Sequence, residues 1–260
     1  MTSDPSFIHV QPAHLAGPGD SSLVTEALLR IGWVHHPDPG LDQVSLHSLS
    51  RTATLRRHRD AAWSLVCHTP ADGAPAWSAS FTPGTPAEVV AASALAMAQS
   101  QRGADHRRLS DLGTPDAFFP RASATALQSG LRLSWAWEEQ GAHLDYCGTP
   151  KTSVGWSFVV RTGQQDDGGW RAGFTPAAPL YAINAALEAA FSTTGVLRRW
   201  NDLPAANLAR LSTPTPAGRA EDRRTAALSF VRPVRITPPL STAPVRCGPG
   251  AAPVPGSRHR

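Results

Sequence analysis

An internal repeat with an offset of 93 residues is the feature that most constrains the fold. Trp63-Ser-Leu-Val-Cys-His-Thr69 reappears as Trp156-Ser-Phe-Val-Val-Arg-Thr162, and Trp77-Ser-Ala-Ser-Phe-Thr-Pro83 reappears as Trp170-Arg-Ala-Gly-Phe-Thr-Pro176. Between 63–97 and 156–190, 12 of 35 aligned positions are identical without any gap. Self-similarity at a fixed offset is typical of repeated structural units, so we expect two tandem copies of one unit.

Each copy contains two runs in which apolar and polar residues alternate. In the first run Trp63, Leu65 and Cys67 alternate with Ser64 and His68. Such alternation is typical of strands that turn one face to a core and the other to solvent. A turn-rich segment joins the two runs, at 70–76 in the first copy and 163–169 in the second. We therefore expect a β-hairpin in each copy.

A helix is expected directly after each hairpin. Thr85-Pro86-Ala87-Glu88 fits a capping box with Pro86 at the first helical position. Ala178 stands where the second copy would need its cap. This predicts a second helix whose start is weaker by roughly 0.5–2 kcal/mol.

Shorter patterns predict the remaining elements. Helical spacing over 21–31 predicts a helix with Asp20 or Ser21 as its N-cap. The other elements expected are strands at 33–36, 43–47 and 52–58, a helix around 115–129, strands near 131–138, 142–146, 156–162 and 170–175, and a helix at 179–191.

Together these elements predict an α+β fold of two tandem two-layer units, 10–102 and 110–204. Each unit is expected to have an antiparallel sheet of about four to five strands with flanking helices. The two units could pack as a pseudo-dimer, and joined sheets are one such arrangement. Residues 212–260 are rich in Pro and Arg and predict a disordered tail, in which 226–236 alternates enough to dock as an edge strand.

Charge is distributed unevenly along the chain. Residues 1–204 contain 15 basic and 18 acidic side chains, whereas residues 205–260 contain nine arginines against Glu221 and Asp222. A basic tail can contact nucleic-acid phosphates. Lys151 is the only lysine, so the arginine bias can also reflect genome composition, which weakens that argument. The candidate contacts to nucleic acid or to a partner are Arg219, Arg223, Arg224, Arg232 and Arg235.

The sequence also resembles a known family. The features that carry the resemblance are His14-Leu-Ala-Gly-Pro-Gly-Asp20, Ala27-Leu-Leu-Arg-Ile-Gly-Trp33, Trp63, and Trp77-Ser-Ala-Ser-Phe-Thr-Pro-Gly-Thr-Pro86 before an Ala-rich helix. They resemble the actinobacterial domain of unknown function numbered 317, which is often found as two tandem copies. The resemblance covers roughly residues 10–195, and the second copy lacks the Gly-Pro-Gly-Asp element. The family implies no catalytic residues for this chain.

Histidines of the first copy are the residues best suited to form a metal site. Five of them fall on expected strands: His35, His36, His47, His58 and His68. Imidazole is the commonest metal ligand among side chains, and the candidate ligands are His47, His58 and His68. Lys151 and Arg161 stand at the positions of His58 and His68 in the second copy. Solvated polar positions are therefore the better interpretation, and we assign no metal and no cofactor.

No catalytic motif is evident in the sequence. It contains no G-x-S-x-G, H-E-x-x-H or G-x-G-x-x-G pattern. Gly17-Pro-Gly-Asp20 lacks the lysine and the spacing of a phosphate-binding loop, so a helix cap at Asp20 explains it better. Cys67, Cys147 and Cys247 form no C-x-x-C pair, which argues against a zinc finger, and Cys67 is expected in the core.

Tryptophans offer another possible ligand-binding feature. Trp63, Trp77, Trp156 and Trp170 share strand faces with apolar residues, so core packing is the better interpretation. The residues without clear apolar partners are Trp135, Trp137 and Trp200.

Three functional hypotheses follow from these observations. The leading one is a non-enzymatic interaction scaffold that binds a protein partner. The second is association with nucleic acid through the basic tail, and the third is metal-dependent activity built on the first-copy histidines. The N-terminus resembles no secretory signal and no apolar run is long enough to span a membrane, so we expect a cytoplasmic protein without membrane contact.

Overall fold

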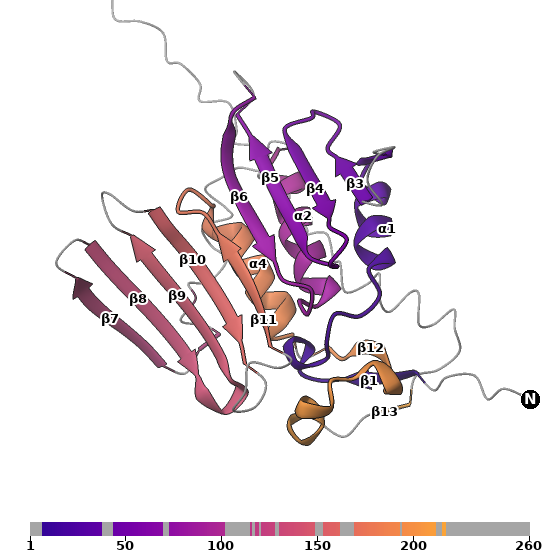
Figure 1. Cartoon of the computed structure of the whole chain (residues 1–260), viewed down its shortest axis with the longest axis vertical. Helices are drawn as coiled ribbons and strands as arrows, with labels where there is room; N and C mark the ends of the chain where they lie inside the picture. The colour runs from indigo at the N-terminus through magenta and orange to yellow at the C-terminus, as the bar shows by residue number, and fades with distance from the viewer. Residues whose placement is uncertain are drawn as a thin grey trace, which may run out of the picture.

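A ten-stranded antiparallel sheet forms the centre of the protein (Figure 1). The computed structural model describes residues 7–37, 44–69, 73–101, 115, 118–119, 121–127, 130–148, 153–161, 169–192, 194–211 and 215–216. In spatial order the strands are β2 (Val34–Pro37), β3 (Val44–His47), β4 (Ala53–Arg57), β5 (Trp63–His68), β6 (Pro75–Phe81), β11 (Trp170–Phe174), β10 (Ser153–Val160), β9 (Ala142–Gly148), β8 (Gly130–Trp137) and β7 (Arg121–Leu127).

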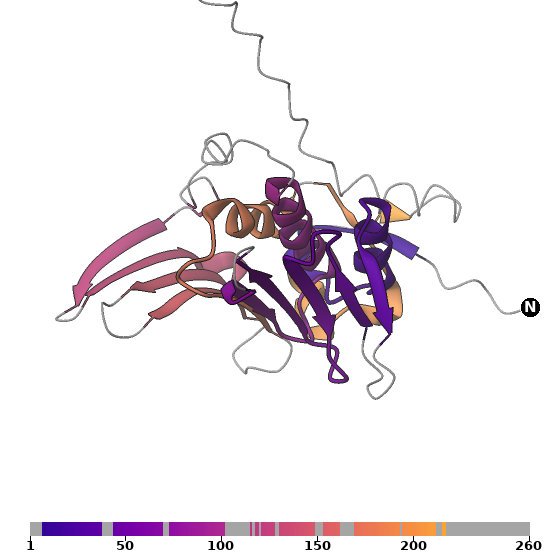
Figure 2. The ribbon, with the colours of Figure 1, turned by 90° about the horizontal axis from the view of Figure 1, so that it is seen from above.

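Three helices cover one face of this sheet: α1 (Ser22–Arg30), α2 (Ala87–Gln101) and α4 (Leu180–Ala190) (Figure 2). Helix α2 packs against both α1 and α4. One hydrophobic cluster fills the space between the helices and the sheet and includes Leu28, Leu65, Phe81, Phe158 and Leu187. The protein is therefore a two-layer α+β structure, as the alternation of apolar and polar residues predicts.

The two halves of the sheet join at β6 and β11. Ser80 lies opposite Gly173, and Phe81 and Ala79 lie opposite Ala172 and Phe174. An antiparallel pair has a local two-fold axis, and here that axis relates positions that are 93 residues apart in the sequence. Helices α2 and α4 begin 93 residues apart as well.

Two threonines repeat this symmetry at the ends of the joint. The backbone N–H of Thr82 donates to the carbonyl of Arg171 at 2.9 Å, and the N–H of Thr175 donates to the carbonyl of Ser78 at 2.9 Å. In return, the hydroxyl oxygen of Thr82 accepts from the N–H of Arg171 at 2.8 Å, and that of Thr175 accepts from the N–H of Ser78 at 3.0 Å. Each threonine thus closes one end of the joint with its backbone and its side chain.

A second, three-stranded sheet joins the two ends of the folded chain. Its order is β12 (Val196–Arg199), β1 (Phe7–Val10) and β13 (Thr215–Pro216) (Figure 1). A smaller apolar cluster supports it, formed by Ile8, Val10, Ala13, Ala16, Val196 and Leu203. The segment before the first half of the large sheet is therefore paired with the segment that follows the second half.

One predicted helix is wrong. The segment expected to be helical around 115–129 contains strand β7, which pairs with β8 along its length. The run Arg121-Ala-Ser-Ala-Thr-Ala-Leu127 is rich in alanine, which favours helices. Its alanines nevertheless alternate with Ser123 and Thr125, and pairing with a neighbouring strand overrides such weak local preferences.

The predicted capping box is also wrong. The carbonyl of Pro86 accepts from the N–H of Val89 at 3.0 Å, so Pro86 precedes α2 instead of occupying its first position. The Thr85 hydroxyl donates to the carbonyl of Arg171, and the Glu88 carboxylate binds Arg198. The Thr85 side chain therefore does not cap α2. The absence of a threonine at the matching position 178 thus gives no reason to expect a weaker start for α4.

The other elements predicted from the sequence agree with the structure to within a few residues. The N-cap residue of α1 is Ser21, and the Oδ1 of Asp20 directly before it accepts from the N–H of Ser22 at 2.8 Å. Of the predicted tail at 212–260, only Thr215–Pro216 lies within the described residues, and the edge strand proposed at 226–236 lies outside them.

Candidate binding surface

The face of the ten-stranded sheet opposite the helices is a candidate binding surface. We call it the open face, because no helix of the described part of the chain covers it (Figure 2). Successive side chains of a strand point to opposite faces of the sheet. In β5, for example, Trp63, Leu65 and Cys67 are buried, so Ser64, Val66 and His68 point to the open face. Among the side chains that the structure describes, this alternation places the following polar residues on the open face: His36, Ser45, His47, Thr54, Arg56, Ser64, His68, Ser78, Ser80, Arg132, Ser134, His143, Asp145, Ser157 and Arg171.

Positive charge predominates among these residues. Asp145 is the one carboxylate in the set just named. Its Oδ1 accepts from Nη2 of Arg132 at 3.1 Å and from the Ser134 hydroxyl at 2.5 Å. Arg56 and Arg171 are exposed and have no acidic ion-pair partner among the described residues. The open face therefore suits an anionic or hydrogen-bonding partner.

A shallow pocket of about 570 Å³ lies at one end of the open face. It is formed by β2, β3, β4 and the hairpin between β3 and β4. Its lining residues are Val34, His36, Ser45, His47, Ser48, Leu49, Arg51 and Arg56. The lining thus combines two guanidinium groups, two imidazoles and two hydroxyls with two exposed apolar side chains.

His47 lines this pocket, and both of its ring nitrogens contact hydroxyl groups. Its Nε2 lies 3.2 Å from the hydroxyl of Ser45, and its Nδ1 lies 3.1 Å from the hydroxyl of Thr54. The ring of His36 packs edge-on against it, with 5.5 Å between the ring centroids. Burial lowers the pKa of His47, and the neighbouring His36 and Arg56 lower it further because they disfavour a second positive charge.

The three histidines considered as metal ligands do not share a site. His68 Nδ1 donates to the carbonyl of Gly73 at 2.8 Å, and His58 Nε2 lies 2.9 Å from the hydroxyl of Ser64. His47 pairs with Thr54 near the start of β4, whereas His58 follows the last residue of that strand. Within the described ranges, no group of three or more His, Cys, Asp or Glu side chains could hold a metal ion.

What the structure pairs with His47 is instead His36, from the edge strand β2. The sequence did not single out this pair, because the register of β2 against β3 decides which of His35 and His36 turns to the open face. His36 lies opposite Ser45, whereas His35 lies opposite the buried Leu46. The sequence would have revealed this pair only if the register of β2 against β3 had been assigned, because that register places His36 and His47 on the same face.

Most of the tryptophans belong to the core and offer no binding surface. Trp63 and Trp170 are buried, and Trp77 and Trp156 pack against the main cluster, as predicted. Trp135, for which the sequence shows no clear partner, is buried and stacks on Trp156 with 5.9 Å between the ring centroids.

The other two tryptophans without clear partners differ from each other. Trp137 stacks on Phe191 at 5.6 Å, so it also belongs to the packed interior. Trp200 is 48% exposed and is the exception.

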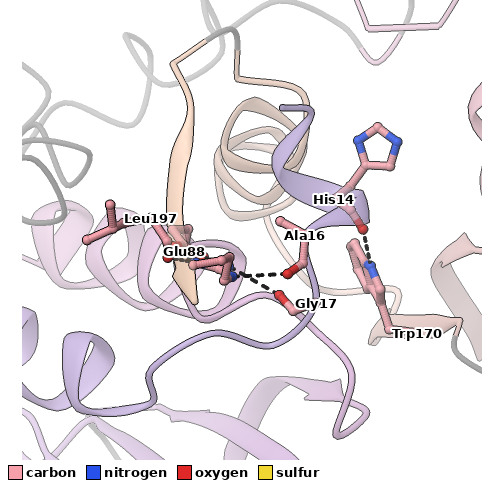
Figure 3. Close-up of polar contacts among 7 residues, drawn as sticks. His14, Ala16, Gly17, Glu88, Trp170 and Leu197 are labelled. Carbon is pink, nitrogen blue, oxygen red and sulfur yellow. Dashed lines mark hydrogen bonds and ion pairs between the residues drawn. The ribbon is translucent and has the colours of Figure 1, made fainter. Parts of the chain in front are cut away.

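Arg198 forms a buried charge network that the sequence did not reveal (Figure 3). Its guanidinium Nη2 and Nη1 lie 2.7 and 2.8 Å from the two carboxylate oxygens of Glu88. The two side chains are only 2% and 5% exposed. Nε and Nη2 also donate to the carbonyls of Ala16 and Gly17, each at 3.1 Å. The network thus ties β12, α2 and the N-terminal segment together.

The Gly-Pro-Gly-Asp element surrounds this network. A side chain at Gly19, where φ is +67°, would place its Cβ 2.5 Å from Cζ of Arg198. The carbonyl of Pro18 accepts from the N–H of Ala87 at 2.8 Å and so caps the start of α2. The element therefore serves the packing of the first half of the chain. Position 181, the counterpart of Glu88 at the offset of 93, is a tyrosine, so the network is not repeated.

His14 connects the N-terminal segment to the second half of the chain (Figure 3). Its Nδ1 donates to the carbonyl of Ala190 at 3.1 Å, and its carbonyl accepts from Nε1 of Trp170 at 2.8 Å. Together with Arg198, it connects the N-terminal segment to both α2 and α4.

The candidate contact residues of the tail lie outside the described part of the chain: Arg219, Arg223, Arg224, Arg232 and Arg235. No helix among the described residues is long and apolar enough to cross a membrane.

Comparison with known proteins gives one match. A family model described as SPDY, a domain of unknown function (DUF317), matches residues 27–102. This segment runs from α1 to the end of α2 and contains the pocket, whereas the Gly-Pro-Gly-Asp element lies before it. No curated protein and no solved structure matches the chain. Residues 27–102 are thus similar to a family whose description assigns no activity.

Proposed function

We propose that this protein is a non-enzymatic binding protein in which two copies of one α+β unit present the open face to a protein partner. The observation that carries the proposal is the arrangement of the layers: α1, α2 and α4 lie on one side of the ten-stranded sheet, and hydroxyl, imidazole and guanidinium groups line the other.

Two copies of one unit are proposed because sequence and geometry agree on the same offset. Positions 93 residues apart are related by the local two-fold axis at Ser80 and Gly173, and Thr82 and Thr175 make equivalent bonds. A duplicated unit that joins its sheet edge to edge doubles the width of one continuous surface, which suits the recognition of a macromolecule.

We propose no reaction because of the groups that the histidine side chains contact. The imidazoles of His47, His58 and His68 each lie within hydrogen-bond distance of a hydroxyl or a carbonyl of the chain itself. A serine beside a histidine can act as a nucleophile and its base, but such a pair also needs a third group that orients the imidazole. Among the described residues, no carboxylate is hydrogen-bonded to His47 or His58. These imidazoles therefore fit a role in positioning the surface.

Affinity capture from a lysate of the source organism tests this proposal. The full-length chain is compared with Arg171→Glu on the open face and with Arg30→Glu at the end of α1. Both substitutions replace an exposed arginine and change the net charge equally. We expect one protein to be enriched with the unaltered chain and with Arg30→Glu, and to be lost with Arg171→Glu. Equal recovery with both variants, or no enrichment at all, would contradict the proposal.

Nucleic-acid association through the tail is a second candidate. It is favoured by the charge distribution, because residues 205–260 contain nine arginines and two acidic side chains, whereas residues 1–204 carry a net charge of −3. Contacts to phosphates release counterions and so depend steeply on salt concentration.

Titration of a fluorescent DNA duplex at several salt concentrations tests this second candidate. The full chain should bind at low salt with an affinity that falls steeply as salt is added, and a chain ending at residue 216 should not bind. Binding by the shortened chain would shift the interaction to the folded part, and no binding by the full chain at low salt would dispose of the candidate.

A further inference from the structure

The pocket at the β2–β4 end of the open face has the chemistry of an anion site. Arg51 and Arg56 both line it, and neither guanidinium has a carboxylate partner among the described residues. Ser45 and Ser48 add hydroxyl groups that can donate, and His36 and His47 add two imidazoles. Unneutralised arginines beside hydroxyl donors are the groups that proteins use to bind phosphate.

The backbone at Arg51 strengthens this argument. Its φ is +55°, in the left-handed region that favours glycine. The hairpin is closed on either side of it by the bonds from Ser48 N–H to the Ala53 carbonyl and from Arg51 N–H to the Ser48 carbonyl. An arginine costs about 1–2 kcal/mol more than glycine in this conformation. Its side chain nevertheless lines the pocket, which is a reason for an arginine to stand there.

The rest of the lining indicates an apolar portion of the ligand. Val34 is 53% exposed and Leu49 is 73% exposed, and both contribute to the pocket. Apolar side chains exposed in a pocket that arginines also line can be covered by the body of a ligand whose anionic head meets the arginines. The volume of about 570 Å³ falls in the range of sites for small organic molecules.

We propose that this pocket binds a small organic phosphomonoester, with its phosphate between Arg51 and Arg56 and its apolar body against Val34 and Leu49. The inference goes beyond the proposed function, because it assigns a small-molecule ligand to one end of the open face. Burial lowers the pKa of His47, and four neighbouring groups lower it further. They are His36 on β2, Arg56 on β4, Arg51 in the β3–β4 hairpin and His68 on β5. A bound dianion would offset this repulsion.

Phenyl phosphate, inorganic phosphate and phenol serve as probes, and binding to the full chain is measured by calorimetry. We expect saturable binding of phenyl phosphate, weaker binding of inorganic phosphate and no binding of phenol. Substitution of Arg51 by glycine removes the guanidinium and also relieves the backbone, so the fold is retained. Both Arg51→Gly and Arg56→Gln should weaken phenyl phosphate binding by roughly tenfold or more, since each removes a charge-assisted contact.

Three variants control for general effects of charge and backbone. Arg59→Ala removes an exposed arginine from the next hairpin and should leave binding unchanged. Ala61→Gly makes the matching backbone change at a position where φ is +65° and should also leave it unchanged. Leu49→Ala should reduce the advantage of phenyl phosphate over inorganic phosphate. Failure of phenyl phosphate to saturate, or equal binding by Arg51→Gly and the unaltered chain, would overturn the inference.

The outcomes for the pocket and for the proposed function are separable. Phosphate-dependent binding without any captured protein would leave the pocket assigned and remove the protein-partner proposal. Capture of a partner that is lost with Arg171→Glu, from a chain that does not bind phenyl phosphate, would do the reverse.

Discussion

At the scale of single residues, the protein concentrates its charge chemistry in two very different environments. Arg198 and Glu88 are almost completely buried, whereas Arg132 and Asp145 are 53% and 32% exposed. Removal of one partner from a buried pair leaves an uncompensated charge, but an exposed pair is screened by water and contributes little. The same type of contact should therefore have very different energetic weight at the two sites.

Urea denaturation of two matched variants tests this difference. Arg198→Leu should lower the free energy of unfolding by about 3–5 kcal/mol, because Glu88 and the carbonyls of Ala16 and Gly17 lose their donors. Arg132→Ala should lower it by less than about 1 kcal/mol. The double variant Arg198→Leu with Glu88→Leu should be more stable than the sum of the single changes predicts. Additive losses would show that the two side chains do not act as a pair.

Cys67 permits a second test at this scale. Burial raises the pKa of its thiol to about 12, and its Sγ lies 2.8 Å from Sδ of Met97. The thiolate is the form that reacts with alkylating agents. At pH 8 we therefore expect iodoacetamide to leave Cys67 unmodified in the folded protein and to modify it in urea, as read by peptide mass mapping.

Cys147, which is partly exposed, is the internal reference for that measurement. It should react in the folded protein. The raised pKa also makes the folded state lose stability as the pH rises from about 9 toward 12, because the unfolded chain then releases the proton more readily. Equal labelling rates for Cys67 and Cys147 in the folded state would contradict the assigned burial.

At the scale of elements, the joint between β6 and β11 decides how wide the sheet becomes. Only three residue pairs form the register at this joint, and Thr82 and Thr175 extend it at both ends. A threonine whose hydroxyl accepts a backbone N–H fixes the strand end more firmly than the backbone bond alone does. These two residues are thus the natural place to test the joint.

The substitutions Thr82→Val and Thr175→Val keep the shape of the side chain and remove its acceptor. Each should lower the free energy of unfolding by about 0.5–1.5 kcal/mol. The loss should be larger at Thr175, whose bond is partly buried, than at the exposed Thr82, where water can replace the hydroxyl. Thr69→Val is the control, because its hydroxyl donates a long bond of 3.4 Å to the carbonyl of Ala74 in an exposed hairpin away from the joint. Unchanged urea midpoints for both joint variants would show that the hydroxyls do not support the joint.

At the scale of the whole molecule, the two ends of the described chain hold each other in place. Strand β1 pairs with β12 on one side and with β13 on the other. Asn207 is buried and its Nδ2 donates to the carbonyl of Leu15 at 2.7 Å. Residues 205–211 and Thr215–Pro216 therefore belong to the folded structure, although the second half of the large sheet ends before them.

Shortened chains test this assignment by thermal and urea denaturation. A chain ending at residue 204 should lose about 2–4 kcal/mol of stability, because the carbonyl of Leu15 loses its donor and β13 is removed. A chain ending at residue 216 keeps these contacts and should match the full-length protein. In the full chain, Asn207→Ala alone should cost about 1–3 kcal/mol. Equal stability of the two shortened chains would mean that the contacts of 205–216 contribute nothing.

The sequence by itself determined the two hairpins β5–β6 and β10–β11, the helices that follow them and the side of these strands that faces the core. These features depend on periods of two and of 3.6 residues, which are local properties of the chain. Trp63, Phe81, Phe158 and Trp170 were therefore placed correctly in the core. Local propensity failed at β7, where alanine-rich sequence pairs as a strand because a neighbouring strand offers it a partner.

Only the tertiary structure decided which edges meet and which charges are buried. Alternation states which face of a strand is apolar but not which strand lies beside it, so the pairing of Ser80 with Gly173 could not be predicted. Glu88 and Arg198 are 110 residues apart, and nothing in their local sequence connects them. The pocket has the same origin: the register of β2 on β3 brings His36 to His47, and the turn at Arg51 completes a site whose parts are unremarkable in the sequence.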